Sequence, residues 1–288
     1  MKVLVTGCYG QVGLALHATI SPNYTGRWYT REQFDLGDSK TMRAALLREK
    51  PDLVINAAAY TKVDQAEAER DEAMAINGAA VATLTELCAE SGAKLVHFST
   101  DFVFDGSQSH PYVTSAPTNP INVYGESKLA GERAVLAGVH NLVIRTSWVY
   151  ASHGRNFVRT MLGLMASRDE LAVVCDQVGT PTHALSLARA TWDLIEANAS
   201  GLHHFTDAGT ASWYDFAVAI QDEAAALGLL KNSARVVPIP AADFPTAARR
   251  PAYSVLDKSA TWAVLGTRPR HWRHELRTML ELLKGEID

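Results

Sequence analysis

The chain has 288 residues, 47% of them apolar, and carries a formal net charge of -4 with an isoelectric point near 6.2. A chain of this length and composition buries one large core or two modest ones, which excludes a disordered or fibrous protein. No cluster of Lys and Arg supplies the phosphate contacts of a nucleic-acid interface, and no segment approaches the ~20 apolar residues of a membrane span, so neither partner is expected.

Short apolar segments alternate with amphipathic segments of helical length in the first half of the chain. The predicted strands cover residues 2–7, 27–30, 52–59, 94–100 and 141–148. The predicted helices begin at Gln11 and after Asp38, extend across 64–91, and include 122–132. This alternation, with strands that are apolar throughout, indicates a Rossmann-type α/β fold, a doubly wound parallel sheet with helices on both faces.

The alternation of predicted strands and helices becomes less regular after Trp148. It predicts a helix near 154–168, a strand at 171–176, a helix from His183, a strand at 201–206 and three helical stretches that end at Lys284. We predict a dinucleotide-binding domain over 1–150, completed by about 180–206, and a smaller, discontinuous C-terminal α/β lobe over 151–288 that binds the substrate. The Pro-containing segment 238–251 is predicted to cross between the two lobes as a loop.

The cellular compartment is predicted from the N-terminus and the cysteines. The chain enters its first predicted strand directly, without the basic and apolar regions of a secretory signal. Cys8, Cys88 and Cys175 are odd in number and lack metal-ligand spacing, which suits a reducing compartment. We therefore expect a cytoplasmic protein.

Gly7, Gly10 and Gly13 form a G-x-x-G-x-x-G pattern between the first predicted strand and the first predicted helix. In this context Gly7 permits a tight turn, Gly10 lets backbone N–H groups approach a pyrophosphate, and Gly13 lets the helix pack closely. A strand-to-helix turn without a ligand is the alternative.

The end of the second strand predicts the kind of dinucleotide. A ribose-binding carboxylate is expected about twenty residues after the glycines, but Arg31 stands there. Because a cation suits a 2′-phosphate, we expect NADPH, with NADH or a merely solvated arginine as the alternatives. Asp35 and Leu36 are candidates for a hydrogen bond and an apolar contact with the adenine.

Small and polar residues follow the third and fourth strands, at the edge where open α/β sheets bind ligands. Residues 57–59 are alanines that leave room for a flat dinucleotide, and Thr100 supplies a hydroxyl. Tyr124 and Lys128 stand one helical turn apart, and therefore on one helix face. A lone Y-x-x-x-K pattern also fits a surface helix with a half-buried tyrosine, so the functional interpretation needs all these groups together.

Two further patterns contain side chains of the types that bind metal ions. The acidic segment 64–72 fits a metal or partner site, but its carboxylates are more simply explained as a solvated helix face. His271 and His274 stand one helical turn apart without a third ligand, so we predict no metal there.

Several motifs together resemble the extended short-chain dehydrogenase/reductase family. They run along almost the whole chain: GQVG, NAAAYTKVDQAE, STDFVFDG, NVYGESKLAGE, RTSWVYA, NFVRTML, DQVGTPT and RRPAYSVLD. Glycine-rich turns and Tyr/Lys pairs are shared by many activities. The later motifs are narrower, and they resemble the nucleotide-sugar 4-ketoreductases that complete dTDP-L-rhamnose synthesis for cell-surface polysaccharides.

This resemblance implies NAD(P)H-dependent reduction of the C4 ketone of dTDP-4-dehydro-L-rhamnose to dTDP-L-rhamnose. Tyr124 would give its phenolic proton to the C4 oxygen as hydride arrives from the nicotinamide. Lys128, with the oxidised nicotinamide, would lower the pKa of that phenol and would orient the nicotinamide ribose. Thr100 would hydrogen-bond the developing oxyanion.

Together with the residues found above, the resemblance implies two sets of binding side chains. The cofactor set is Gly7, Gly10, Gln11, Val12, Gly13, Arg31, Asp35, Leu36, Ala59, Tyr60, Thr61, Phe98, Tyr124 and Lys128. The sugar-nucleotide set is Thr100, Asp101, Trp148, Asn156, Gln177 and Arg250. In the second set Trp148 offers a flat apolar wall and Arg250 a fork of donors for the diphosphate.

One residue departs from the pattern of the family. Some of these reductases carry a Glu shortly after the last glycine that helps to bind Mg²⁺ between two subunits, and here that residue is Ala15. We therefore predict no bound metal and no metal-bridged dimer, and we expect a monomer or a weak homodimer.

Other activities of the same fold are less compatible with the sequence. A 4,6-dehydratase needs an Asp-Glu pair after the Thr, and here Phe102 follows Asp101. The chain is short for an epimerase and lacks a Ser-rich fourth-strand motif. The remaining alternatives are a 4-ketoreductase with the opposite stereochemistry or another deoxysugar substrate, an epimerase of the same family, and a non-catalytic dinucleotide-binding regulatory subunit.

Overall fold

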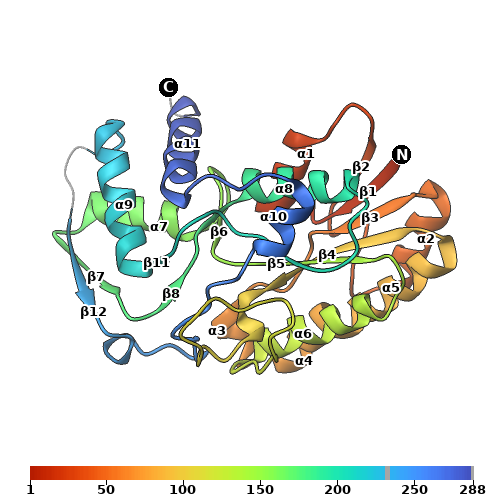
Figure 1. Ribbon diagram of the computed structural model, residues 1–288, viewed down its shortest axis with the longest axis horizontal. Coiled ribbons are helices and arrows are strands. Elements are labelled where there is room, and N and C mark those ends of the chain that lie inside the picture. The colour runs from red at the N-terminus through yellow and green to blue at the C-terminus, as the bar shows by residue number, and fades with distance from the viewer. Residues whose placement is uncertain (231–233, 287–288) are drawn as a thin grey trace.

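A six-stranded, wholly parallel sheet forms the centre of the computed structural model, which describes residues 1–230 and 234–286 (Figure 1). The strand order is β10-β5-β4-β3-β1-β2. The strands are β1 Lys2–Thr6, β2 Thr25–Tyr29, β3 Leu53–Asn56, β4 Lys94–Thr100, β5 Leu142–Thr146 and β10 Gly201–His204. The predicted doubly wound parallel sheet is therefore confirmed, with strand ends that differ from the prediction by a few residues.

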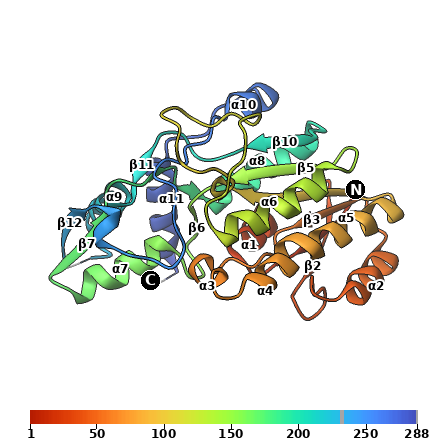
Figure 2. The same cartoon turned by 90° about the horizontal axis from the view of Figure 1, so that it is seen from below.

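Helices cover both faces of this sheet, which explains why β3 and β5 are buried along their whole length. On one face lie α1 (Gln11–Thr19), α8 (Ala184–Glu196) and α10 (Ser259–Leu265). On the other lie α2 (Ser39–Glu49), α5 (Ala80–Ser91) and α6 (Val123–Leu136), which stand in front of the sheet in Figure 2. Each face has its own apolar core cluster.

The helical region predicted over 64–91 is divided into four pieces. They are α3 (Val63–Ala66), α4 (Arg70–Met74), the π-helical turn η1 (Ala75–Ala79) and α5. The side chain of Asn77, in the π-helical turn, hydrogen-bonds both the backbone N–H and the C=O of Tyr60. The wider turn therefore ties the segment after β3 to the helix layer.

The C-terminal region forms a second layered unit with its own core, on the left in Figure 1. Its helices are α7 (Phe157–Ser167), α9 (Trp213–Ala226) and α11 (Trp272–Gly285), and β7 (Glu170–Val174) pairs in parallel with β12 (Arg235–Ile239). The short elements are β6 Val149–Tyr150, β8 Val178–Gly179, β9 Thr182–His183, β11 Ala211–Ser212 and the 3₁₀ turns η2 Asp101–Val103 and η3 Ala241–Asp243.

The segment 238–251 connects this unit to the first. Its first two residues extend β12, an edge strand that tolerates Pro238, so the predicted loop begins slightly later. Farther on, the guanidinium of Arg250 binds the Asp64 carboxylate of α3. The predicted crossing of the loop is therefore confirmed.

The acidic segment 64–72 has a role beyond a solvated helix face. Besides Asp64, Glu67 accepts a hydrogen bond from the backbone N–H of Val123 at the start of α6, 2.9 Å away. Glu69 accepts one from the phenol of Tyr60 at 2.7 Å. These carboxylates brace three separate segments, so the prediction of a merely solvated face was incomplete.

A buried carboxyl, Asp207, lies just beyond β10. It is fully buried, and its Oδ2 accepts a hydrogen bond from the backbone N–H of His183 at 2.8 Å. Burial raises the pKa of Asp207 to about 8, against the effect of that hydrogen bond. The native state therefore holds this proton between about pH 4 and pH 8, where an unfolded chain releases it.

We expect Asp207→Asn to remove a pH-dependent loss of stability. Because the native state binds more protons in this window, wild-type stability falls as pH rises through it. An Asn keeps the acceptor for His183 but does not titrate. The Tm of Asp207→Asn should exceed that of wild type at pH 8 and match it near pH 4, as measured by calorimetry. Parallel Tm curves across this range would contradict the assignment.

None of the helices within 1–230 and 234–286 has the length and apolar character that a membrane crossing needs.

Candidate active site

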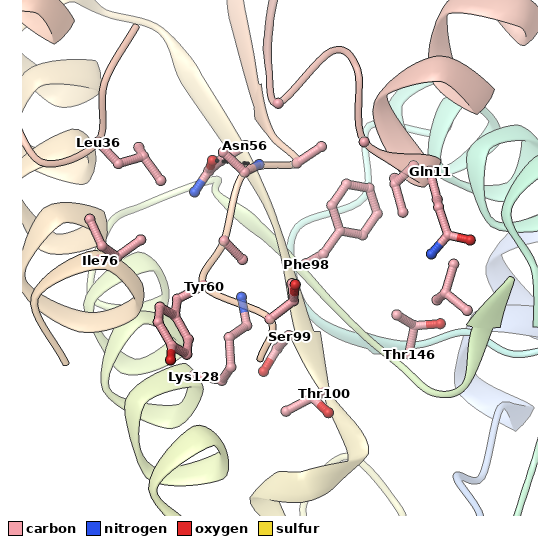
Figure 3. A pocket seen from close by; sticks show the side chains of 18 of the residues that line it. Gln11, Leu36, Asn56, Tyr60, Ile76, Phe98, Ser99, Thr100, Lys128 and Thr146 are labelled. Carbon is pink, nitrogen blue, oxygen red and sulfur yellow. Dashed lines mark hydrogen bonds between the residues drawn. The ribbon is translucent and has the colours of Figure 1, made fainter. Parts of the chain in front are cut away.

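A cavity of about 650 Å³ opens at the carboxyl ends of β1, β3, β4 and β5, where the strand order reverses between β1 and β3. The predicted site residues that line it are Gly7, Gly10, Gln11, Val12, Arg31, Asp35, Leu36, Ala59, Tyr60, Thr61, Phe98, Thr100, Asp101, Tyr124, Lys128 and Trp148. Figure 3 shows Leu36 and Ile76 near one end, and Ser99, Thr100 and Lys128 together at another. The tertiary structure thus assembles most of the predicted set.

The glycine turn has the geometry that its spacing predicts. Gly7 has φ +64°, and a Cβ there would lie 2.8 Å from the backbone of Ala57. A Cβ at Gly13 would lie 2.2 Å from the carbonyl oxygen of Gly7, so Gly13 packs the helix onto the turn and does not line the cavity. Gly10 is the N-cap residue and has no capping side chain. The N-terminus of α1 is therefore open to an anion.

The end of the cavity near β2 contains Arg31, Asp35 and Leu36. Arg31 is exposed, while Asp35 accepts a hydrogen bond from the backbone N–H of Gly37 at 2.9 Å. Glu72 and Ile76 also line this end and were missed in the sequence. Ile76 lies in the π-helical turn, for which the sequence contains no periodic signal, and Glu72 lies in α4 just before it.

Tyr124 and Lys128 both line the cavity from α6, as the one-turn spacing predicts. The carboxamide of Asn122 caps this helix by accepting from the backbone N–H of Gly125 at 2.7 Å, which sets the first turn. Lys128 is only 3% exposed, and its Nζ lies 3.3 Å from Nε2 of His97 on β4. The amine points into the cavity between Tyr60 and Ser99 in Figure 3.

Burial dominates the electrostatics at Tyr124. Burial and the nearby Asp101 raise the pKa of the phenol to about 12, partly offset by a hydrogen bond with Thr100. Burial also lowers the pKa of Lys128, to about 8. The acidification of this phenol by Lys128 together with a bound, oxidised nicotinamide stays a prediction.

Thr100 and Asp101 lie beside the phenol at the end of β4. The Thr100 hydroxyl donates to Asp101 Oδ1 at 3.0 Å and accepts from the backbone N–H of Phe102 at 3.1 Å. Asp101 is 2% exposed, and burial raises its pKa to about 6. The ring of Phe102 packs edge-on against Tyr124, with centroids 5.9 Å apart. An aromatic ring therefore stands where a dehydratase would need its second carboxylate.

Trp148 forms one wall of the cavity and has a strained backbone, with φ +46°. Its ring stacks on Trp213 of α9, with centroids 3.5 Å apart and planes 7° apart. A Cβ at Gly179 would lie 2.7 Å from ring atoms of Trp148, so the glycine of the DQVGTPT motif makes room for this indole. Trp213 was missed because nothing in the local sequence connects it to Trp148.

Three residues predicted for the sugar nucleotide lie outside the cavity lining. Arg250 already holds Asp64 through two hydrogen bonds of 3.0 and 2.7 Å. Asn156 caps α7 and donates to Oε1 of Gln11 at 2.9 Å, so it supports a lining residue. Gln177 is half-buried just before β8. The structure therefore does not place these side chains in the cavity for which we predicted them.

Within the described part of the chain, no group of three or more His, Cys, Asp or Glu side chains is placed to hold a metal ion. Ala15, the residue that departs from the family pattern, is 1% exposed and belongs to the core cluster beneath α8.

Comparisons with known proteins agree with this geometry. Residues 1–284 match the family model described as RmlD substrate binding domain. A dTDP-4-dehydrorhamnose reductase of Burkholderia thailandensis is 43% identical, covering 95% of this chain and 96% of that protein. A dTDP-4-keto-6-deoxy-D-glucose reductase of Streptomyces niveus is 39% identical, covering 98% of each. The crystal structure of dTDP-4-dehydrorhamnose reductase from Bacillus anthracis in complex with NADP superposes with a TM-score of 0.92 at 34% identity, covering 98% of this chain and 99% of that one.

Proposed function

The chain belongs to the RmlD substrate binding domain family, and on that basis we propose that it reduces the C4 ketone of dTDP-4-dehydro-L-rhamnose to dTDP-L-rhamnose with NADPH. The observation that carries this proposal is a single cavity that connects the glycine turn to Thr100, Tyr124 and Lys128. A dinucleotide site and an acid-base pair thus share one space. The names of the relatives and the NADP complex support the same assignment.

The residues that line the cavity fit a dinucleotide that carries a 2′-phosphate. The turn at Gly7 leaves no room for a Cβ, and the uncapped N-terminus of α1 offers N–H groups to a pyrophosphate held by Gly10, Gln11 and Val12. The exposed cation of Arg31 suits a 2′-phosphate, so NADPH is favoured over NADH. Asp35, Leu36, Phe98 and residues 59–61 would line the groove between the adenine and the nicotinamide.

A bound nicotinamide supplies the hydride, and the protein's own groups handle the proton. Tyr124 stays protonated near neutral pH because its pKa is about 12, and it gives this proton to the C4 oxygen as hydride arrives. The Thr100 hydroxyl lies beside the phenol and would share the charge that develops on the same oxygen. Lys128 would stabilise the phenolate that remains, and Asp101, which lines the same cavity, would bind the sugar.

Trp148 is proposed to position the sugar ring, and Gly179 controls where this indole lies. We expect Gly179→Ala to raise the KM for the keto sugar about tenfold or more, because the new methyl group forces the indole out of place. The affinity for NADPH should change little, because this contact lies away from the glycine turn. Steady-state kinetics and NADPH titration measure the two effects separately.

Gly163→Ala is the matched control for this substitution. Gly163 lies on α7, and a Cβ there meets nothing within 4 Å. We expect an unchanged KM and a small gain in stability, because Ala is the better helix former. A rise in KM that is equal in both variants would contradict the role of Gly179.

The function itself is tested by incubating the protein with NADPH and dTDP-4-dehydro-L-rhamnose and identifying the product by NMR. Formation of dTDP-L-rhamnose supports the proposal. A product with the opposite C4 configuration would favour the stereochemical alternative. Turnover only with dTDP-4-keto-6-deoxy-D-glucose would favour the activity named for the Streptomyces relative. Tight NADPH binding without turnover of either sugar would favour a regulatory subunit.

The remaining sequence-based predictions are retained as proposals. We propose that residues 1–150 with about 180–206 bind the dinucleotide, and that the rest of 151–288 binds the sugar nucleotide. We also propose a cytoplasmic monomer or weak homodimer without bridging Mg²⁺. A sedimentation experiment in which EDTA dissociates a dimer would refute the proposed absence of bridging Mg²⁺.

A further inference from the structure

A row of buried polar side chains crosses the sheet and ends at Lys128. Thr6 on β1, Asn56 on β3 and His97 on β4 are direct partners in the register of adjacent strands. The Thr6 hydroxyl lies 2.7 Å from Asn56 Oδ1, Asn56 Nδ2 lies 3.2 Å from His97 Nδ1, and His97 Nε2 lies 3.3 Å from Lys128 Nζ. Each of these four residues is at most 3% exposed. We call this row the polar ladder.

The orientation of the Asn56 amide is set by its neighbours. Its oxygen is approached by the Thr6 hydroxyl and by the backbone N–H of Ala58, at 2.7 and 3.2 Å. A backbone N–H can only donate, so the oxygen must face it, and the amide NH₂ must face the imidazole of His97. The NH₂ group can only donate, so Nδ1 of His97 accepts.

This arrangement determines the tautomer of His97. Complete burial holds the pKa of His97 well below its ordinary value, so the ring is neutral and carries one proton. Because Nδ1 accepts from Asn56, that proton is on Nε2 and points at the lysine nitrogen. An ammonium has no lone pair to accept it, whereas a neutral amine does.

We propose that His97 is a positioning residue for Lys128, and that the polar ladder favours the neutral amine of this lysine and holds its nitrogen at the cavity wall. The inference rests on the proposed function only in taking Lys128 as the partner of Tyr124. When Tyr124 gives up its proton, the new negative charge favours the ammonium, which takes its proton from solvent in the cavity. The positive charge that stabilises the phenolate of Tyr124 therefore forms once the phenol has given up its proton.

The other charged groups around Lys128 do not by themselves fix whether it is an amine or an ammonium. On its own helix, Glu132 favours the ammonium, but its carboxylate is engaged by Arg145 of β5 at 2.9 Å. Asp101, from η2, acts on Tyr124. Burial already lowers the pKa of Lys128 to about 8, and the hydrogen bond from the ladder favours the neutral amine further.

The first test determines the tautomer of His97 in the wild-type protein without added nucleotide. Long-range ¹H–¹⁵N correlation spectra of ¹⁵N-histidine-labelled protein distinguish the two tautomers, and His97→Gln identifies the signal. We expect the Nε2–H form at every pH from 6 to 9. An Nδ1–H form or an imidazolium in that range would overturn the proposal. The tautomer itself is measured on the wild-type protein, and the variant serves only to assign the signal.

The second test uses Asn56→Asp to reverse the direction of the hydrogen bonds that His97 makes in the polar ladder. A carboxylate can only accept, so it moves the proton of His97 to Nδ1 and leaves Nε2 free to accept from an ammonium. The titration of Lys128, followed by ¹³Cε-lysine NMR and identified with Lys128→Met, should shift upward by about one pH unit or more.

The carboxylate in this variant also acts through its charge alone. The double variant Asn56→Asp, His97→Leu keeps that charge but removes the imidazole that transmits the tautomer. We expect a clearly smaller upward shift in the double variant, and equal shifts would refute the role of His97. Neither measurement requires turnover. Failure to reduce the keto sugar would therefore remove the proposed function and leave this inference standing, and the reverse also holds.

Discussion

Tyr124→Phe is expected to lower kcat by about 10²-fold or more, with a much smaller change in the affinity for NADPH. The substitution removes one oxygen from the cavity and keeps the ring that packs against Phe102. Because the pKa of this phenol is about 12, it supplies a proton throughout the range from pH 6 to pH 9. Its loss therefore removes the proton donor at every pH in this range.

The kinetics of Tyr112→Phe provide the comparison. Tyr112 is buried outside the cavity lining, and its phenol donates to the Asp105 carboxylate at 3.1 Å. We expect an unchanged kcat in this variant, with a small loss of stability at most. A kcat of Tyr124→Phe within twofold of wild type would refute the assignment of Tyr124 as proton donor.

Glu132→Gln is expected to lower the free energy of unfolding by about 3 to 5 kcal/mol. Glu132 and Arg145 are each only 3% exposed, and the Oε2 atom of Glu132 also accepts a hydrogen bond from Ser99 at 2.7 Å. The substitution leaves the buried guanidinium of Arg145 without its counter-charge. Solvent cannot reach it to compensate, so the native state bears the cost of an unpaired buried cation.

Glu90→Gln makes the same chemical change in an exposed ion pair. Glu90 binds Arg43 at 2.6 Å, but both side chains are more than half exposed. We expect a change within about 0.5 kcal/mol, because water and salt screen such a pair. Urea unfolding followed by circular dichroism measures both variants. Similar losses at the two sites would show that burial is not what makes the Glu132 pair important.

Much of the site was predictable because its features are local in sequence. The glycine spacing between a strand and a helix determined the turn at Gly7 and the packing at Gly13, since each is a steric requirement within a few residues. The one-turn spacing of Tyr124 and Lys128 placed both on one helix face, because helical periodicity also acts within a few residues. Apolar strands alternating with helices predicted the parallel sheet, whose carboxyl edge then located the cavity.

Other features depend on contacts between distant segments. Arg250 was assigned to a diphosphate from its chemistry, but packing of segment 238–251 against α3 brings it to Asp64. Trp213 reaches Trp148 only because α9 folds over the cavity wall. Residue type alone does not distinguish a side chain that binds a ligand from one that binds another part of the chain, because the same guanidinium or indole suits both.

The sequence by itself determined the class of fold, the dinucleotide turn and the pair of groups on α6, since local sterics and helical periodicity act between near neighbours. Only the tertiary structure decided the environment of that pair. The register of three strands aligns Thr6, Asn56 and His97 behind Lys128, and burial raises the pKa of Tyr124 and lowers that of Lys128. Strand register and burial are properties of the assembled sheet, because they arise from contacts between residues that are far apart along the chain.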